Sequence, residues 1–414
     1  MLTSFSTALS ALDASLTAID VVGNNLANLN TAGFKASSLS FHDMMSQSIG
    51  GGLGTTQVGF GVGTPITLRH FSQGAIQSTG GQLDVAIQGD GFFVVNTPGG
   101  ATEYTRAGNF QVNLDGYLMT ATGEKLQGWT AANNVVNTNA PTGPITVPTG
   151  TLAPPSATTT TSLDLNLDAS ATAGAPNGTF ASSVEVFDSL GTSHIVTYTF
   201  TKTATPNQWT YSARIPAGDT TPASAPVTGT LTFDANGQLI TPAANAAQPV
   251  IAAAGLNDGA ANLSITWNLY NGATPRLTQF AQASATSAIA QNGAAAANLV
   301  GVSLSDGGKV LAQYSNGQQV VVGQLAVATI RNPESLIGVG NSNFQTSALT
   351  AAPVVGVPGT GGRGTVLGGS IESSTVDIAR EFTNLIVFQR GYEANAHVIT
   401  TADQLSQATI NLKP

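Results

Sequence analysis

The stretch NNLANLNTAGFKA, residues 24–36, lies at the boundary between a helical sequence pattern and a turn. It begins as the end of an apolar-striped helical pattern and ends in the turn Thr-Ala-Gly-Phe, residues 31–34. Because this change comes so early, the chain starts with one short and very hydrophobic helix. The fold depends on what that helix packs against.

Apolar residues recur every seven positions before this turn, in two interleaved series. The first series is Leu2, Leu9 and Leu16, and the second is Phe5, Leu12, Ile19 and Leu26. This spacing predicts a coiled-coil seam. The opposite face has only two charges, Asp13 and Asp20, which is few for a face exposed to water. We therefore expect neighbours on several sides of the helix, and the alternative is an ordinary helical hairpin packed on the chain's own β core.

The other end of the chain has a second apolar helical pattern, within residues 374–412. Its seam positions are Ile378, Phe382, Leu385, Tyr392, Ala396, Ile399 and, after a shift of phase, Leu405. Gly391 in the middle of this pattern costs about 1 kcal/mol relative to alanine, which suggests a close contact or a bend there. The two terminal helices are predicted to pair with each other.

Composition limits what the protein does. Charged residues make up 8% of the 414 residues and the net charge is −9, so a nucleic-acid partner is not expected. The sequence has no cysteine, which excludes disulfides, zinc–thiolate sites and thiol nucleophiles. The start has no Lys or Arg before its apolar part, unlike a cleaved secretory signal. We also expect no segment long and apolar enough to cross a bilayer, and therefore no membrane insertion.

The middle of the chain changes to short β-type runs separated by glycine turns. Asp115-Gly116, Asn236-Gly237 and Asp306-Gly307 each supply the positive φ of a tight hairpin turn. A Pro- and Thr-rich stretch near residues 141–161 and a low-complexity stretch near 280–298 bracket a separate β domain. The predicted fold class is therefore mainly β and multidomain, with paired terminal helices and a discontinuous β wall domain that carries an inserted β domain. The expected segments are 1–34 (N-terminal helix), 35–71 (flexible linking region), 72–145 with 285–365 (wall domain), 146–284 (inserted domain) and 366–414 (C-terminal helix).

No motif in the sequence indicates catalysis, a cofactor or a metal. His42, His70, His194 and His397 have no carboxylate or second histidine at ligand spacing. The glycine-rich residues 50–63 lack the phosphate-binding pattern and are interpreted as a flexible connector. Carboxylates such as Asp84 and Asp115 are typical of turns. We therefore predict a protein that is not an enzyme.

Three stretches, in this order along the chain, resemble signatures of the rod and hook family of axial proteins of the bacterial flagellum. They are residues 24–35 (NNLANLNTAGFK), 80–95 (GGQLDVAIQGDGFFVV) and 376–405. The motif residues carried by the resemblance are Asn24, Asn25, Asn28, Gly33, Phe34, Lys35, Asp84, Gly89, Gly91, Phe92, Phe93 and Arg390. The inserted domain favours a hook-type member of the family, and the alternative is a distal rod protein. A secreted β-rich enzyme or adhesin remains as a different class of protein.

The resemblance implies a self-polymerising structural subunit, with terminal helices packed as an inner tube around an export channel. It implies a location in the extracellular hook of the flagellum and export by the flagellar type III apparatus without a cleaved signal peptide. The implied partners are copies of the same chain, the distal rod, the hook cap, the hook-length ruler and the hook–filament junction proteins. Glycines in residues 50–63 would allow the subunit to flex.

Overall fold

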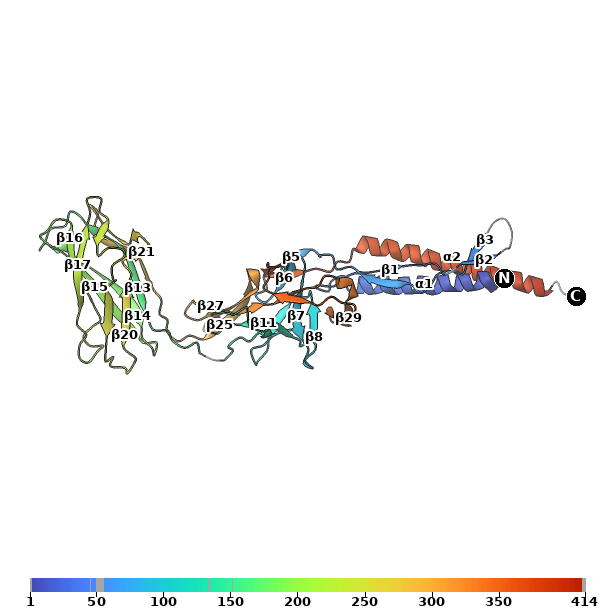
Figure 1. The fold of residues 1–414 in the computed structure, drawn as a ribbon, viewed down its shortest axis with the longest axis horizontal. Coiled ribbons are helices and arrows are strands. Elements are labelled where there is room, and N and C mark those ends of the chain that lie inside the picture. Colours follow the sequence, from blue (N-terminus) through green and yellow to red (C-terminus); the bar gives the residue numbers. More distant parts are fainter. Residues whose placement is uncertain (1, 45, 50–55, 133–134, 151, 412–414) are drawn as a thin grey trace. The chain divides into compact units, whose positions relative to one another are not determined.

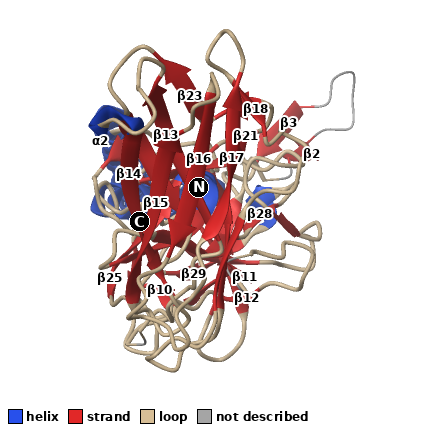
Figure 2. Ribbon diagram, turned by 90° about the vertical axis from the view of Figure 1, so that its left-hand side faces the viewer, coloured by secondary structure: helices blue, strands red, loops and turns tan. Residues whose placement is uncertain are grey.

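The computed structural model describes residues 2–44, 46–49, 56–132, 135–150 and 152–411. The terminal unit comprises Met1–Thr149, Gly301–Gln313 and Gln319–Pro414, and the inserted unit comprises Gly150–Val300 and Tyr314–Gln318. Strands predominate in both units, and the α-helices of the described residues belong to the terminal unit (Figures 1 and 2). The predicted fold class, mainly β with N- and C-terminal helices, is confirmed.

The helices α1 (Leu2–Ala27) and α2 (Ile378–Asn411) pack against each other as an antiparallel pair (Figure 1). The α2 helix begins after Asp377, whose Oδ1 accepts backbone hydrogen bonds from Ala379 at 2.9 Å and Arg380 at 3.2 Å. This is the arrangement of an N-cap, which satisfies amides that have no partner within the helix.

Small side chains form the buried face of α1. Ala8, Ala14 and Ala18 are at most 3% exposed, and Val22 is also 3% exposed. On the α2 side, a Cβ added to Gly391 would lie 3.9 Å from Ser15 Oγ, so the two helices approach closely there. The intramolecular contact of α1 is therefore built on alanines, and not on the heptad leucines that the sequence pattern singled out.

A 13-stranded sheet forms the main part of the terminal unit. Its central path runs in the order β25 (Leu299–Ser305), β26 (Lys309–Tyr314), β27 (Gln319–Leu325), β11 (Lys125–Thr130), β7 (Phe92–Asn96), β8 (Thr102–Thr105), β30 (Asn343–Gln345), β29 (Ile337–Gly340). The strands beside this path are β9 (Phe110–Val112), β10 (Leu118–Thr120), β12 (Gly143–Pro144), β28 (Val327–Thr329) and β31 (Val354–Gly356). Because β11 pairs with both β7 and β27, sequence from either side of the insertion forms one sheet.

Four two-stranded ladders complete the terminal unit. They are β1 (Ser37–Ser40) with β4 (Ile66–Arg69), β2 (Ser46–Ile49) with β3 (Thr56–Gly59), β5 (Ile76–Ser78) with β33 (Ser370–Glu372), and β6 (Val85–Gln88) with β32 (Thr365–Gly368). The last two ladders join segments from opposite ends of the chain. Short 3₁₀ turns occur at η2 (Asp306–Gly308) and η3 (Pro333–Ser335).

The region 35–71 differs from the flexible linking region that the sequence suggested. Its β-prone runs Ser37–Ser40 and Ile66–Arg69 pair antiparallel along their whole length, because Thr, Ile, Leu and Ser suit an extended backbone. Thr56–Gly59, within the glycine-rich stretch, is also a strand. Residues 50–55 of that stretch lie outside the described residues, so the proposed flexing of these glycines remains a prediction.

Two five-stranded sheets form the inserted unit. One contains β19 (Val250–Ala253), β20 (Leu263–Trp267), β13 (Thr160–Asp168), β23 (Leu277–Phe280) and β24 (Ala285–Gln291). The other runs in the order β14 (Thr179–Phe187), β15 (Ser193–Lys202), β16 (Gln208–Arg214), β17 (Val227–Phe233), β18 (Leu239–Thr241). A ladder of β21 (Tyr270–Asn271) with β22 (Thr274–Pro275) and the turn η1 (Pro176–Gly178) are also present.

Both sheets of the inserted unit contribute to one hydrophobic core. Trp267 of β20 is fully buried and contacts Tyr198 and Phe200 of β15 and Tyr211 of β16 at ring-centroid distances of 4.9, 6.0 and 5.1 Å. Each buried aromatic side chain removes a large apolar area from water. The aromatic cluster therefore holds the two sheets together as one domain.

The boundary of the inserted unit corrects the prediction. Residues 285–300 were assigned to the wall domain, but β24 pairs antiparallel with β13 and belongs to the inserted unit. These residues were predicted to lie outside the inserted unit because their low-complexity composition, rich in Ala and Ser, resembles that of a linker. They nevertheless form a strand. The N-terminal boundary lies at Gly150 and not at residue 146.

The predicted hairpin turns are present. Gly116, Gly237 and Gly307 have φ values of +81°, +76° and +76°. The first two follow β9 and β17 in hairpins, and Gly307 lies in η2 between β25 and β26. Glycine is favoured at each position because other residues rarely adopt such angles.

A buried histidine ties together the loops at one end of the inserted unit. His194 Nδ1 lies 2.9 Å from Asp219 Oδ2, and His194 Nε2 lies 3.2 Å from Asp188 Oδ2. Burial alone lowers the pKa of His194, but the hydrogen bonds and charges of Asp219 and Asp188 outweigh burial and raise the pKa above its ordinary value of 6.5. For Asp188, burial acts to raise the pKa. Hydrogen bonds with Asp258, Thr192, His194 and Leu190 act more strongly in the opposite direction, and the pKa is lowered overall.

These shifts predict how the stability of the inserted unit depends on pH. A raised histidine pKa adds stability that is complete below about pH 6.5 and is lost as pH rises through the folded-state value. The unit should therefore melt at a higher temperature at pH 5.5 than at pH 9. Replacing His194 with Gln should remove about 1–3 kcal/mol of stability at pH 5.5 and flatten this dependence. Calorimetry at both pH values measures the effect, and an unchanged pH dependence in the variant would contradict it.

Candidate assembly surface and its anchoring junction

The predicted seam residues of α1 divide into two groups in the structure. Phe5, Leu9 and Leu16 are 43%, 46% and 46% exposed. Leu12, Ile19 and Leu26 are half-buried, and the side chain of Leu2 lies outside the described part of the chain. Leu9 and Leu16 of the first series and Phe5 of the second are thus directed away from the chain's own core.

The seam residues of α2 divide in the same way. The half-buried ones are Leu385, Tyr392, Ala396 and Ile399, whereas Ile378, Phe382 and Leu405 are 47%, 51% and 59% exposed. Further exposed apolar side chains of α2, which the sequence pattern did not single out, are Ile386, Val387, Val398 and Ile410. They were missed because the heptad count followed a single stripe.

We define the helix surface as the exposed apolar side chains of both helices: Phe5, Leu9, Leu16, Ile378, Phe382, Ile386, Val387, Val398, Leu405 and Ile410. Exposed apolar side chains in this number on two paired helices are typical of an interaction site. Covering each such side chain contributes up to about 1.5–3 kcal/mol. Covering all ten side chains therefore provides a free energy that can drive the assembly of an ordered polymer.

The expectation that no segment is long and apolar enough to cross a bilayer is wrong for α1. Residues Ser4–Ala27 pass that test by length and composition, with a mean hydropathy of 1.3 over the best window. The sequence assessment gave too much weight to the hydroxyl residues between the leucines. Core helices and signal sequences also pass the same test.

The turn that follows α1 is fixed by backbone contacts. Asn25 is 1% exposed, and its side chain donates to Ser37 O at 2.7 Å and accepts from Ser37 N at 3.0 Å. Gly33 has φ +68°, and its amide donates to Glu372 O at 2.8 Å. A Cβ at Gly33 would lie 2.4 Å from Ala107 N, so both the backbone angles and the available space require glycine here.

A buried ion cluster lies directly behind this turn. Glu372 Oε1 is 2.6 Å from Lys35 Nζ, and Glu372 Oε2 is 3.1 Å from Arg106 Nη1. The side chains of Lys35 and Glu372 are fully buried, and that of Arg106 is 4% exposed. We call these three residues the junction cluster. It joins the segment after α1, the central β region and the strand that leads to α2.

Hydrogen bonds to the backbone complete the junction cluster. Lys35 Nζ donates to Ser72 O at 2.7 Å, Gly74 N donates to Glu372 Oε1 at 2.7 Å, and Arg106 Nη2 donates to Gly89 O at 2.8 Å. Burial lowers the pKa of Lys35 below its ordinary value of 10.5, although Glu372 acts in the opposite direction. A buried ion pair needs such additional partners to offset its loss of hydration.

The central signature packs beside this cluster. Arg106 lies over the ring of Phe92 at 5.4 Å, and Phe92 contacts Phe71 and Phe344 edge-on at 5.6 and 6.1 Å. Gly91 has φ +133°, and a Cβ there would meet Val327 Cγ1 at 2.5 Å. The glycines of GDGFF thus allow two backbone segments of the chain to approach closely where the aromatic residues pack.

The remaining motif residues have other surroundings. Phe34 O accepts from Thr375 N at 3.2 Å, and Phe93 stacks edge-on with Phe110 at 5.3 Å. Asp84 accepts from the Thr79 hydroxyl. Asn24 and Asn28 are joined by a side-chain hydrogen bond of 3.2 Å at the exposed end of α1. Gly89 has φ +97°, and Arg390 lies on the exposed surface of α2.

The sequence interpretation missed Glu372, the ion-pair partner of Lys35, and Arg106, the second cation that pairs with Glu372. They lie 337 and 71 residues away from Lys35 along the chain, so no local spacing connects them. The signal that was present is Lys35 itself. In a chain with few charges, a cation in an otherwise neutral turn motif needs a carboxylate partner once it is buried.

Removing the charge of Glu372 tests the junction cluster. Glu372→Gln leaves two buried cations without an anion, so the terminal unit should lose about 3–5 kcal/mol of stability. The matched control is Glu393→Gln, because Glu393 pairs with Arg390 on the surface, where the two side chains are 61% and 79% exposed. The control should change stability by less than about 0.5 kcal/mol. Denaturant titration of the monomer measures both, and equal stabilities would disprove the role of the cluster.

Four family models match successive parts of the chain. They are Flagella basal body rod protein at residues 5–35, Flagellar hook protein FlgE/F/G D1 domain at 86–168, Flagellar basal body protein FlaE D2 domain at 158–294, and Flagellar basal body rod FlgEFG protein C-terminal at 367–412. The FlaE D2 domain match lies within the inserted unit and covers all of it except its outermost residues.

Similar proteins and a solved structure agree with these matches. Flagellar hook protein FlgE of Escherichia coli (strain K12) is 33% identical over 430 residues, covering 99% of this chain and 100% of that protein. FlgE of Borreliella burgdorferi is 33% identical over 448 residues and covers 100% of both chains. The crystal structure of Helicobacter pylori FlgE2 covers 72% of this chain and 100% of its own, with a TM-score of 0.53 at 14% identity, which shows a likeness in fold. From these full-length relatives, together with the matched domains, we conclude that the chain belongs to the flagellar hook protein FlgE family.

Proposed function

We propose that the chain is a structural subunit that polymerises into a curved, flexible tube and transmits torque from the flagellar rod to the filament. The observation that carries this proposal is the helix surface. In one chain its apolar side chains are exposed, with Phe382 and Leu405 more than half exposed, although water does not favour such a surface. Copies of the same two helices are the partner that provides matching apolar stripes in every subunit.

The parts of the chain have separate roles in this proposal. The paired helices form an inner tube around an export channel, the sheet of the terminal unit forms the wall, and the inserted unit lies outside. The low charge of the helices suits a channel wall that binds passing unfolded chains weakly. The junction cluster makes the step from helix to wall rigid within each subunit, so flexing takes place elsewhere, between subunits or at the glycines of residues 50–63.

Partners and export follow from the same proposal. The tube would contact the distal rod at its base, the cap and the length ruler during growth, and the junction proteins of the filament at its end. Export would use the flagellar type III route without a cleaved signal peptide, and α1 would then serve in assembly and not in a membrane. No catalytic role is proposed for any residue.

Negative-stain imaging of the purified polymer separates the proposed hook from a distal rod. Curved tubes support the hook, whereas straight and stiff shafts support the rod. A chain that stays monomeric at high concentration would contradict both and favour a secreted protein of another class.

Leu16 tests the helix surface. Leu16→Asp should prevent assembly, because a charge placed in an apolar contact costs several kcal/mol and is repeated in every subunit. The monomer should stay folded, since Leu16 is 46% exposed within one chain. Circular dichroism monitors the fold, and sedimentation with electron microscopy monitors the polymer.

The matched control is Leu16→Met, which keeps an apolar side chain of similar volume and should assemble normally. Normal polymer yield from Leu16→Asp would show that this residue lies outside the contact between subunits. Unfolding of the Leu16→Asp monomer would instead favour the intramolecular hairpin.

The inserted unit can be removed at a defined place. Ala153 and Ala297 form an antiparallel bridge, with Ala153 N donating to Ala297 O at 2.9 Å. A short Gly-Ser linker can therefore replace residues 154–296 without stretching the chain. We expect the shortened protein to form tubes of altered curvature. If it folds but forms no tubes, the inserted unit is part of the assembly core.

A further inference from the structure

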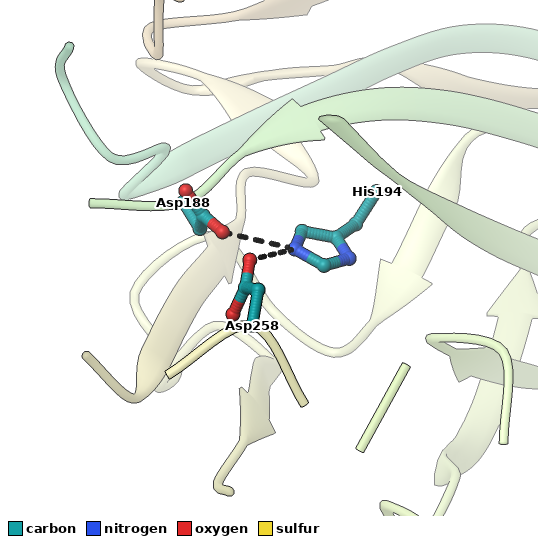
Figure 3. A group of neighbouring side chains, drawn as sticks. All are labelled: Asp188, His194 and Asp258. Atoms are coloured by element: carbon teal, nitrogen blue, oxygen red, sulfur yellow. Dashed lines mark hydrogen bonds and ion pairs between the residues drawn. The ribbon is translucent and has the colours of Figure 1, made fainter. Parts of the chain in front are cut away.

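The loops at one end of the inserted unit place a histidine and three aspartates together. Asp188 follows β14, His194 lies near the start of β15, Asp219 follows β16, and Asp258 lies between β19 and β20. Figure 3 shows the side chains of Asp188 and Asp258 directed at the same edge of the His194 ring. His194 Nε2 lies 3.2 Å from Asp188 Oδ2 and 3.8 Å from Asp258 Oδ2.

The sequence search, which looked for carboxylates or a second histidine at ligand spacing, did not find this arrangement. The aspartates lie 6, 25 and 64 residues from His194 along the chain. They converge because the strands of two sheets end in neighbouring loops, which are tied by hydrogen bonds from Asn257 N to Asp219 O at 3.0 Å and from Ala261 N to Ser189 Oγ at 3.0 Å. A ligand search based on sequence spacing cannot see this convergence.

The backbone orients the carboxylates. Asp188 Oδ1 accepts hydrogen bonds from Leu190 N at 2.8 Å and Thr192 N at 2.9 Å, and Asp258 Oδ1 accepts one from Ala260 N at 3.0 Å. Each carboxylate thus uses one oxygen to close its own turn. The other oxygen, Oδ2, faces the imidazole in both cases.

Asp219 orients the imidazole. Its Oδ2 lies 2.9 Å from His194 Nδ1, so Nδ1 carries a proton and donates it to this carboxylate. Nε2 can share its proton with Asp188, and once this proton is lost the lone pair of Nε2 points at the two Oδ2 atoms. A carboxylate behind the second nitrogen is the usual support of a histidine that binds a metal.

The charges of the group are not balanced within the protein. Three carboxylates carry three negative charges, whereas the imidazole supplies at most one positive charge. Among the described residues, no lysine or arginine forms an ion pair with Asp188, Asp219 or Asp258. The Oδ2 atoms of Asp188 and Asp258 both face His194 Nε2, and two carboxylate oxygens in this position repel one another unless a proton or a metal ion lies between them.

We propose that Asp188, His194 and Asp258 bind a divalent first-row transition metal ion, with Asp219 as the positioning residue behind His194. The ligand atoms of the three residues all lie within 4.8 Å of one another. Ligands of a tetrahedral zinc ion with bonds of about 2.0–2.2 Å are about 3.3–3.6 Å apart, so small side-chain movements suffice. An imidazole with two carboxylates suits zinc or manganese better than calcium, which prefers oxygen ligands alone.

The bound ion would join loops from both sheets. Asp258 is 26% exposed at its side chain, so the site is open to solvent on one side, and water can enter as a further ligand. The ion would replace the proton that otherwise bridges His194 and Asp188. Binding should therefore release a proton and weaken as pH falls.

The test uses the full chain as a monomer, freed of metal with EDTA and titrated with Zn²⁺ by calorimetry. We expect one site per chain, and substitution by Co²⁺ should produce visible absorption bands of a nitrogen and oxygen ligand set. His194→Gln should abolish the site. Asp219→Asn should weaken zinc binding about 10–100-fold, and Asp258→Asn should weaken it at least as much.

The matched control is Asp234→Asn. Asp234 Oδ1 accepts from Asn236 N at 2.9 Å and Gln238 N at 2.8 Å, in a turn like that of Asp188, so this variant should bind zinc as the unmodified chain does. Asp258 closes an exposed turn, and Asp258→Asn therefore tests the site even if His194→Gln fails to fold. The proposal is overturned if the unmodified chain binds no zinc, if Asp258→Asn binds it equally well, or if Ca²⁺ binds with the same affinity.

Discussion

The carboxylate of Glu372 is the point on which the arrangement of the terminal unit depends. It is fully buried and accepts from Lys35, from Arg106 and from the amide of Gly74. These residues come from the segment after α1, from the central β region and from the segment just before β5. Because a buried carboxylate cannot be left without its cations, the three segments are held in one arrangement. The cluster thus makes the chain's two ends and its middle a single folded unit.

This constraint explains why the helices can leave so much apolar surface exposed. The intramolecular contact of α1 uses Ala8, Ala14 and Ala18, which bury little area each. Such a pair gains modest stability from its own packing. The direction in which α1 and α2 leave the sheet is set by Asn25, Gly33 and the junction cluster, and so the larger side chains can stay exposed.

The sequence predicts some of these features better than others. The heptad spacing of Leu9 and Leu16 and the glycine turns at Gly116 and Gly237 are local patterns, and the structure contains both helices and both turns. The extent of the inserted unit was harder to predict, because β24 (ATSAIAQ) is rich in Ala and has no strand-like alternation. The junction cluster and the surroundings of His194 could not be found, since each depends on residues brought together by long-range pairing. Where the seam leucines would point was also undetermined, because heptad spacing does not say whether the partner helix belongs to the same chain.

The unequal lengths of the two helices have a consequence for load transfer. The 34 residues of α2 are eight more than the 26 of α1, and α1 ends at the same end of the pair at which α2 begins (Figure 1). About 12 Å of α2, at 1.5 Å per residue, therefore extends past its companion. This overhang carries Leu405 and Ile410, both exposed. In the proposed stack of copies, this projecting end would reach the next layer, and axial pull and twist would then be shared between successive layers instead of being carried by one row of contacts.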